Sequence, residues 1–140
     1  MILTTKQEEG LQTAVARFKA GERWTTISGY AGSGKSTLVK FIIAALGVPP
    51  EKVCYIAFTG KAASVLKQKG CENAMTAHKL LYKASPTPDG KYIFIPKKSL
   101  DEDYSVLVVD EVSTLPKKMW DLLLSHRVYV LALGDPGLLI

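Results

Sequence analysis

Hydrophobic positions along this chain follow two alternating patterns. Short runs rich in apolar and β-branched residues, which are typical of strands buried on both faces of a parallel sheet, occur at 24–28, 52–58, 105–109 and 127–133. Segments with apolar residues three or four positions apart, which are typical of amphipathic helices, occur at 4–20, 35–46, 59–67 and 116–124. This alternation of helix and strand predicts an α/β fold with a parallel sheet flanked by helices.

Between the third of these helices and the third strand, the pattern is less regular. Asp89-Gly90 follows a proline-rich turn and introduces an aromatic and apolar strand at 91–98 that lysines flank, so a protruding hairpin is predicted at 84–100. Tyr92 and Phe94 in this strand either stack on nucleic-acid bases or pack back on the domain.

Two further segments begin with a threonine that can cap a helix. Thr59-Gly60-Lys61 leads from a predicted strand into a helix, and this turn either holds a phosphate group or is a capped helix with an exposed lysine. Residues 74–82 resemble a short helix capped by Thr76. His78 in this helix is expected to pack or to form a hydrogen bond, because no metal-ligating residue stands at a suitable spacing from it.

A glycine-rich stretch joins the first strand to the second helix. Its pattern, Gly29, four further residues and then Gly34-Lys35-Ser36, is that of a phosphate-binding P-loop, although a glycine-rich turn can match it by accident. Glycines allow the backbone N–H groups to approach phosphate oxygens closely, and the N-terminus of the following helix attracts the same anion. Lys35 is expected to reach the β- and γ-phosphates, while Ser36 binds Mg²⁺.

An acidic pair, Asp110-Glu111, directly follows the predicted strand at 105–109. Ligands of open α/β sheets bind beyond the carboxyl ends of the strands, so both carboxylates are expected near the P-loop. Asp110 is then placed to hold Mg²⁺, and Glu111 is placed to act as the general base that activates water.

Composition sets limits on the partners and the compartment. The chain has 140 residues, which suit one domain, and 18 basic against 13 acidic residues give a net charge of +5. This charge favours an anionic partner, either nucleotide alone or nucleic acid as well. Cys54 and Cys71 are far apart and predict reduced thiols. With neither a signal peptide nor an apolar stretch of membrane-spanning length, the expected location is the cytoplasm, without membrane contact.

Together these motifs resemble the first motor domain of superfamily 1 DNA helicases, in the RecD-like and Dda-like branch that moves 5′ to 3′ along single strands. Five stretches match the motifs of that family: Leu3 to Gln7, Gly29 to Thr37, Ala57 to Ala63, Thr76 to Leu81 and Val109 to Ser113. The resemblance implies a three-layer, RecA-like P-loop NTPase fold that binds ATP and Mg²⁺, and strands in the order 1-4-3-2. The hairpin corresponds to a small insertion that separates strands in the family.

The resemblance also assigns roles to individual residues. Gln7, which taken alone is either solvated or bound to an adenine edge, is implied to read adenine. The implied nucleotide-binding residues of the P-loop are Gly29, Ala31, Gly32, Ser33, Gly34, Lys35, Ser36 and Thr37. The implied contacts to single-stranded DNA are Thr59, Gly60, Lys61, Thr76 and His78, with Tyr92 and Phe94 as candidate residues of the strand-separating pin.

Two departures from the family pattern bear on activity. Leu138 stands where the family has a glutamine that senses the γ-phosphate. The second RecA-like domain, with its arginine fingers, is also missing, so the chain is expected to be a truncated motor domain, incomplete at its C-terminus, with its first strand on an exposed edge. An arginine supplied in trans can accelerate hydrolysis roughly 10³- to 10⁵-fold, so the prediction is ATP binding with little hydrolysis.

Two other classes of protein share part of this pattern. A P-loop module whose ATP state controls the docking of DNA or protein, without motor activity, is favoured by Leu138 and by the missing second domain. A small-molecule or nucleotide kinase is a weaker alternative, because it needs an arginine-rich lid and the chain has only Arg17, Arg23 and Arg127.

Overall fold

The computed structural model describes residues 3–27 and 35–134, and of Lys35 and Ser36 it describes the backbone alone. The predicted P-loop residues Gly29, Ala31, Gly32, Ser33 and Gly34 therefore lie outside the described residues, as does Leu138. Within the described part, no helix is both long enough and apolar enough to cross a membrane.

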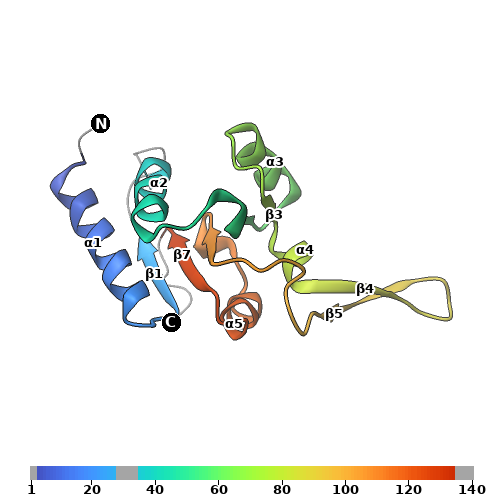
Figure 1. The fold of residues 1–140 in the computed structure, drawn as a ribbon. Helices are drawn as coiled ribbons and strands as arrows, with labels where there is room; N and C mark the ends of the chain where they lie inside the picture. The colour runs from blue at the N-terminus through green and yellow to red at the C-terminus, as the bar shows by residue number, and fades with distance from the viewer. Residues whose placement is uncertain (1–2, 28–34, 135–140) are drawn as a thin grey trace.

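A five-stranded parallel sheet forms the centre of the described chain (Figure 1). Its strands, in spatial order, are β1 (Trp24–Ile27), β7 (Tyr129–Leu133), β6 (Val106–Val109), β2 (Val53–Ala57) and β3 (Ala74–Thr76). The four strands that the apolar runs predict are arranged 1-4-3-2, as the family resemblance implies. Valine, isoleucine and leucine dominate these strands because helices cover both faces of the sheet.

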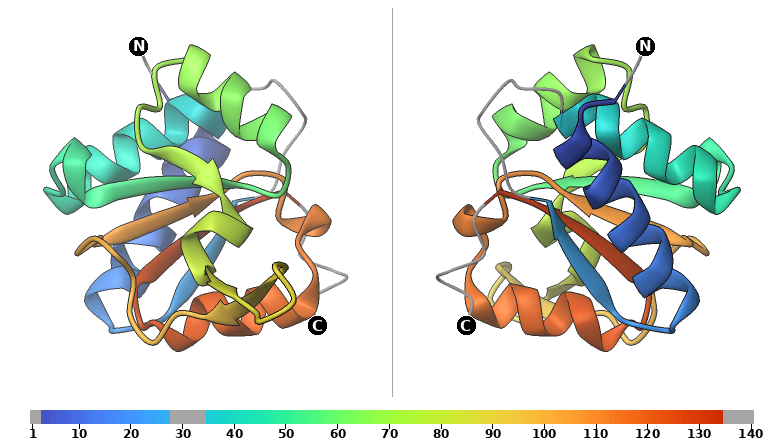
Figure 2. Two further views of the ribbon diagram at one scale, coloured as in Figure 1. Left: turned by 90° about the vertical axis from the view of Figure 1, so that its right-hand side faces the viewer. Right: turned by 90° about the vertical axis from the view of Figure 1, so that its left-hand side faces the viewer.

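Helices form a layer on each side of this sheet (Figure 2). Apolar residues of α1 (Thr5–Lys19) and α2 (Lys35–Leu46) pack on one face, against side chains such as Val108 and Leu131. Residues of α4 (Ala77–Leu81) and α5 (Lys117–Ser125) pack on the opposite face, where Leu107 and Val130 are fully buried. The three-layer, RecA-like α/β fold predicted from the sequence is therefore confirmed.

Threonine caps fix the start of three helices. Thr4 and Gln7 form a reciprocal capping box at the first turn of α1. The Thr59 hydroxyl accepts a hydrogen bond from the Ala62 N–H at the start of α3 (Gly60–Gln68), and the Thr76 hydroxyl accepts one from the Lys79 N–H in α4, each at 3.1 Å. Each cap satisfies an N–H group that the helix itself leaves without a partner. Two short 3₁₀ helices complete the connections, η1 (Pro50–Lys52) and η2 (Val112–Thr114).

Helix α1 also covers the edge strand β1, for which the sequence predicts exposure. The Arg17 guanidinium donates two hydrogen bonds to the Trp24 carbonyl, at 2.8 and 3.0 Å. The buried Tyr129 hydroxyl donates to the Ala14 carbonyl at 2.8 Å and is also hydrogen-bonded to the Thr25 hydroxyl. These contacts hold α1 against β1 and β7, so that backbone and side-chain polar groups near this edge find partners inside the protein.

A hairpin of β4 (Tyr82–Pro86) and β5 (Tyr92–Pro96) projects from the side of the domain (Figure 1). The predicted small hairpin insertion is thus present. At its tip, the Asp89 carboxylate accepts hydrogen bonds from the Thr87 hydroxyl and, at 3.2 Å, from the Lys91 N–H, and Gly90 has a φ of 83°. Gly90 therefore supplies the left-handed backbone that this turn requires.

One prediction of secondary structure is wrong. Residues 74–82 do not form a single helix, because Ala74–Thr76 pairs with β2 as strand β3, with Ala57 opposite Thr76. The helix begins only after the Thr76 cap, and it ends at Leu81, where β4 begins. Backbone groups along the edge of β2 form hydrogen bonds with Ala74–Thr76, and this pairing makes them a strand. Three residues are too few to show the alternation that predicts a strand from sequence.

Candidate functional site

The predicted acidic pair lies at the carboxyl edge of the sheet. Asp110 extends β6, because its N–H donates to the Ile56 carbonyl of β2 at 2.8 Å. On the other side, the Gly134 N–H at the end of β7 donates to the Ile27 carbonyl at the end of β1, at 3.0 Å. The predicted P-loop runs from this same end of β1 to Lys35, the first residue of α2. The structure therefore brings the end of β1, which precedes the predicted P-loop in the sequence, and the acidic pair to one edge.

Glu111 has an unusual backbone conformation. Its φ of 50° and ψ of 59° are left-handed, which is uncommon for a residue other than glycine. Its carbonyl accepts two hydrogen bonds from Thr114, from the N–H at 2.9 Å and from the hydroxyl at 2.7 Å. The side chain of Glu111 is exposed, whereas the next residue, Val112, is fully buried. The turn thus leaves the carboxylate accessible while it returns the chain to the core.

Asp110 faces the helix that follows β2. It is half-buried and lines a hollow of about 340 Å³ together with residues of the α3 region. These residues are Thr59, Lys61, Ala62, Val65, Leu66 and Lys69. Two of the predicted DNA contacts, Thr59 and Lys61, therefore share a hollow with the predicted Mg²⁺ ligand.

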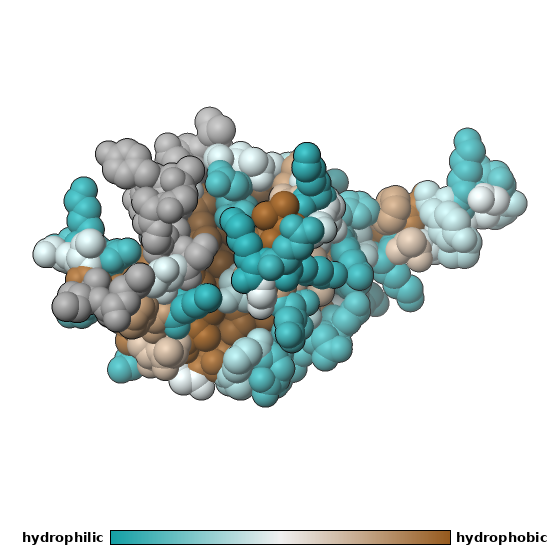
Figure 3. Space-filling model, turned by 90° about the horizontal axis from the view of Figure 1, so that it is seen from above, coloured by the Kyte–Doolittle hydropathy of each residue, from teal (hydrophilic) through white to brown (hydrophobic). Residues whose placement is uncertain are grey.

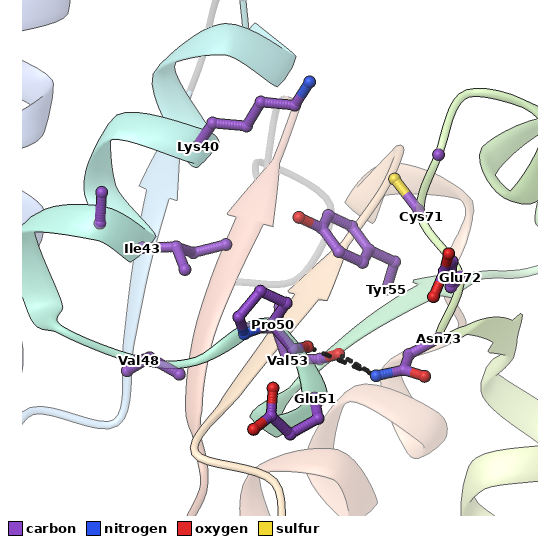
Figure 4. A pocket seen from close by; sticks show the side chains of 12 residues that line it. Lys40, Ile43, Val48, Pro50, Glu51, Val53, Tyr55, Cys71, Glu72 and Asn73 are labelled. Atoms are coloured by element: carbon purple, nitrogen blue, oxygen red, sulfur yellow. Dashed lines mark hydrogen bonds between the residues drawn. The ribbon is translucent and has the colours of Figure 1, made fainter.

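A larger hollow of about 720 Å³ lies between α2 and the loop that follows α3 (Figure 4). Tyr55 lies in it, and the Asn73 side-chain amide donates to the carbonyls of Val53 and Pro50. Burial raises the pKa of the Cys71 thiol, with opposing effects from Lys40, which lowers it, and Asp110, which raises it. This hollow lies over the α2 face of the sheet.

Thr76 and His78 lie further along the same edge, where β3 passes into α4. The His78 ring stacks on Tyr82, with 4.8 Å between ring centroids, and lies edge-to-face with Phe94, at 4.5 Å. It thereby links α4 to both strands of the hairpin. His78 was expected to pack or to form a hydrogen bond, and the structure shows ring packing.

Beside these rings is a groove of about 940 Å³ at the base of the hairpin. It includes four lysines, which are Lys79, Lys83, Lys97 and Lys98. The Lys97 ammonium is held by the Lys79 carbonyl at 3.0 Å and by Asp101 at 2.7 Å. From above, the hairpin extends from the body and carries both hydrophobic and hydrophilic residues (Figure 3). Tyr92 is 65% exposed and Phe94 is 55% exposed, so neither ring is packed into the core.

Gln7 has a structural role that the sequence analysis did not weigh. Its side-chain carbonyl accepts a hydrogen bond from the Thr4 N–H at 2.9 Å, and its own N–H donates to the Thr4 hydroxyl at 3.1 Å. The side-chain carbonyl oxygen of Gln7 therefore takes part in the capping box. Its role in reading adenine stays a prediction.

Sequence reasoning also missed Thr114 and Gly134 as neighbours of Glu111. A Cβ atom at Gly134 would lie 3.6 Å from the Val112 N and 3.8 Å from the Glu111 Cα, and Gly134 has a φ of 110°. Threonine hydroxyls can form hydrogen bonds with nearby backbone groups in turns, which is only a weak signal for the contact that Thr114 makes. Two lysines of the groove, Lys97 and Lys98, had a stronger signal, since they stand at the end of the predicted hairpin strand.

A parallel sheet in this order, with an acidic pair beyond β6 and a P-loop sequence between β1 and α2, defines the class of P-loop nucleotide-binding proteins. A family model described as an AAA domain matches residues 3–137. The chain therefore belongs to the AAA domain family.

One relative makes the position within this class more specific. The ATP-dependent DNA helicase dda of Enterobacteria phage T4 is 32% identical to this chain over 126 residues. The match covers 88% of this chain and 28% of the helicase, so the chain spans less than a third of the length of that relative. The resemblance to a Dda-like superfamily 1 motor domain is thus confirmed.

Proposed function

We propose that this chain is the ATP-binding motor domain of an ATP-dependent DNA helicase, which couples ATP hydrolysis to movement along single-stranded DNA and to duplex unwinding. The observation that carries the proposal is the order of segments along one edge of the sheet. From β1 outward, this edge holds the end of β1, which precedes the P-loop sequence, then the acidic pair, the α3 turn at Thr59 and the α4 turn at Thr76. The groove with four lysines follows at the hairpin.

In this proposal, the nucleotide would bind at the part of the sheet edge nearest β1. Lys35 and Ser36 would hold phosphate oxygens and Mg²⁺ at the start of α2, and Asp110 would hold Mg²⁺ from the end of β6. Hydroxyl and carboxylate oxygens are the donors that Mg²⁺ prefers, so the residues fit the ion. When bound, Mg²⁺ would neutralise charge on the phosphates. Glu111 would take a proton from the attacking water, which its exposed side chain can reach.

Single-stranded DNA would bind at the other end of this sheet edge, near α3, α4 and the hairpin. Thr59, Gly60 and Lys61 offer a hydroxyl, a backbone N–H and an ammonium group to backbone phosphates. The lysines of the hairpin groove add positive charge, and exposed aromatic rings on β5 can stack on bases whatever the sequence. In this proposal, DNA at Lys61 and nucleotide at Asp110 would be neighbours, because both residues line the same hollow.

A second RecA-like domain is the expected partner of this one. Because the match spans only 28% of the phage helicase, we propose that unwinding requires further chain that supplies transition-state charge stabilisation, worth roughly 10³- to 10⁵-fold in rate. The isolated chain is then expected to bind ATP and to hydrolyse it slowly.

Nucleotide binding can be tested by titrating a fluorescent ATP analogue with the chain in the presence of Mg²⁺. Lys35→Ala should weaken binding strongly, whereas Lys40→Ala is a matched control, because Lys40 is an exposed lysine on the same helix. Equal affinity of the Lys35→Ala variant and the parent would contradict the assigned site.

Turnover with and without single-stranded DNA separates a motor domain from a non-motor module. A motor domain predicts slow hydrolysis that DNA accelerates and that Glu111→Gln abolishes. Tight ATP binding that changes DNA affinity, with no turnover even when the remainder of the helicase is supplied, would favour a nucleotide-dependent binding module instead.

A further inference from the structure

The backbone at Glu111 is strained where the proposed chemistry takes place. Among the described residues, Glu111 and Arg127 are the non-glycine residues with positive φ, at 50° and 59°. Glutamate has no short side chain that bonds its own backbone, as asparagine has, so the left-handed conformation is unfavourable for it. Strain of this kind persists only when surrounding contacts impose it.

Two hydrogen bonds from one residue impose the turn at Glu111. The Thr114 N–H and hydroxyl both donate to the Glu111 carbonyl, at 2.9 and 2.7 Å. The N–H bond closes η2 and would survive most substitutions, whereas the hydroxyl bond depends on the side chain. Thr114 is itself exposed, so its side chain does not fill the core.

The end of β7 packs against the other side of the same turn. A Cβ atom added at Gly134 would be in ordinary van der Waals contact with the backbone of Val112 and Glu111. The end of β7 therefore lies close to this turn. Val112, fully buried, anchors the turn in the core. The turn at Glu111 therefore lies between the Thr114 hydrogen bonds and the end of β7, and the Glu111 side chain is exposed at the carboxyl edge.

We propose that Thr114 is a positioning residue, whose hydroxyl holds Glu111 in the left-handed conformation that directs its carboxylate to the nucleotide site. The role of this carboxylate rests on the proposed function, whereas the conformational restraint does not. A right-handed or extended Glu111 would point the Cα–Cβ bond in a different direction, so the restraint acts on the orientation of the carboxylate rather than on its acidity.

The restraint is tested first by NMR, without nucleotide. The one-bond coupling between Cα and Hα of Glu111 differs between positive and negative φ. We expect the positive-φ coupling in the parent chain and in Thr114→Ser, which keeps the hydroxyl, and its loss in Thr114→Val, which has the same shape without it. An unchanged coupling in Thr114→Val would overturn the proposal.

Strain at Glu111 also predicts an unusual effect of glycine. Glu111→Gly should fold with an equilibrium constant roughly 2- to 10-fold larger than Glu111→Ala, because glycine adopts positive φ without steric cost, and this gain exceeds its larger loss of entropy on folding. At the exposed neighbour Ser113, the same comparison should favour alanine, because glycine loses more entropy on folding. If glycine is also the poorer residue at position 111, the strain is absent and the proposal fails.

Turnover then connects the restraint to the proposed chemistry. Thr114→Val should lower kcat at unchanged affinity for ATP, and Thr114→Ser should restore it. If the parent chain fails to bind ATP, the proposed function is wrong, while the coupling and the glycine comparison still decide the restraint. If Thr114→Val loses the left-handed signature but keeps full turnover, the positioning role is overturned.

Discussion

The imidazole ring of His78 lies edge-to-face against Phe94, with ring centroids 4.5 Å apart and an angle of 75° between the planes. The same imidazole stacks on Tyr82 at 24°. His78 belongs to α4 and Phe94 to β5, so this contact ties the hairpin to the helix that begins where β3 ends. The rings help to orient the hairpin relative to the sheet edge, together with the hydrogen bonds that the Lys97 N–H and ammonium donate to the carbonyls of Leu81 and Lys79.

His78→Ala is expected to loosen the hairpin and to weaken binding of single-stranded DNA roughly two- to tenfold, since each aromatic pair contributes about 0.5–1.5 kcal/mol. Hydrogen exchange of β4 and β5 amides and fluorescence anisotropy with a labelled oligonucleotide measure the two effects. His78→Phe is the informative control, because it keeps the ring and removes the ring nitrogens. If His78→Phe binds DNA as poorly as His78→Ala, the histidine acts by direct polar contact with DNA and not by packing.

Adjacent residues of β5 give a matched test of base stacking. Phe94 and Ile93 are 55% and 52% exposed, and they point to opposite faces of the hairpin because they are neighbours on one strand. Phe94→Ala should cost about 1–3 kcal/mol in affinity for single-stranded DNA, the usual contribution of one stacked base. Ile93→Ala removes a similar exposed area and should leave the affinity unchanged. Equal losses in the two variants would show that the hairpin binds through its general apolar character.

Much of the fold could be predicted because local signals agree with tertiary structure. A helix cap is the prediction for Thr76 and one of two alternatives for Thr59, and each hydroxyl accepts the hydrogen bond that a cap requires. Four strands were visible as apolar runs because both of their faces are covered. The acidic pair could be placed at the sheet edge from its position after the strand at 105–109 alone.

The features that sequence could not reveal depend on contacts between distant segments. Ala74–Thr76 becomes a strand because β2 has an unpaired edge there, and three residues carry no periodicity to predict it. The left-handed Glu111 accepts hydrogen bonds from Thr114 three residues later, and glutamate itself gives no sign of positive φ. The ring contacts of His78 likewise require the hairpin to fold back beside α4.

Gln7 combines two roles that single substitutions can separate. Gln7→Glu keeps a capping box with Thr4, because glutamate serves at this position equally well, but it loses the amide N–H donor. We expect this variant to keep the thermal stability of the parent and to lose affinity for ATP if Gln7 reads adenine. Thr4→Ala should do the opposite, lowering stability by about 1 kcal/mol at unchanged affinity. Denaturant titration and nucleotide titration measure the two effects, and parental ATP affinity in Gln7→Glu would contradict the adenine role.

His126 predicts how stability depends on pH. It caps the C-terminal end of α5, and its Nε2 is buried without a hydrogen-bond partner among the described residues. Burial lowers the pKa of His126, because the charged imidazolium is poorly solvated there. The folded protein therefore favours the neutral ring, while the unfolded chain binds a proton near the ordinary histidine pKa of about 6.5.

Unfolding takes up a proton at His126 between these two pKa values, so the free energy of unfolding should fall as the pH is lowered below about 6.5 and should level off below the folded pKa. Urea titrations at a series of pH values from about 7.5 to about 5 measure this slope. His126→Gln has no titrating ring, so its slope in this range should be smaller than that of the parent. His78→Gln, at the other histidine, which is exposed, is the matched control. A slope that His126→Gln does not change would place the pH dependence elsewhere in the chain.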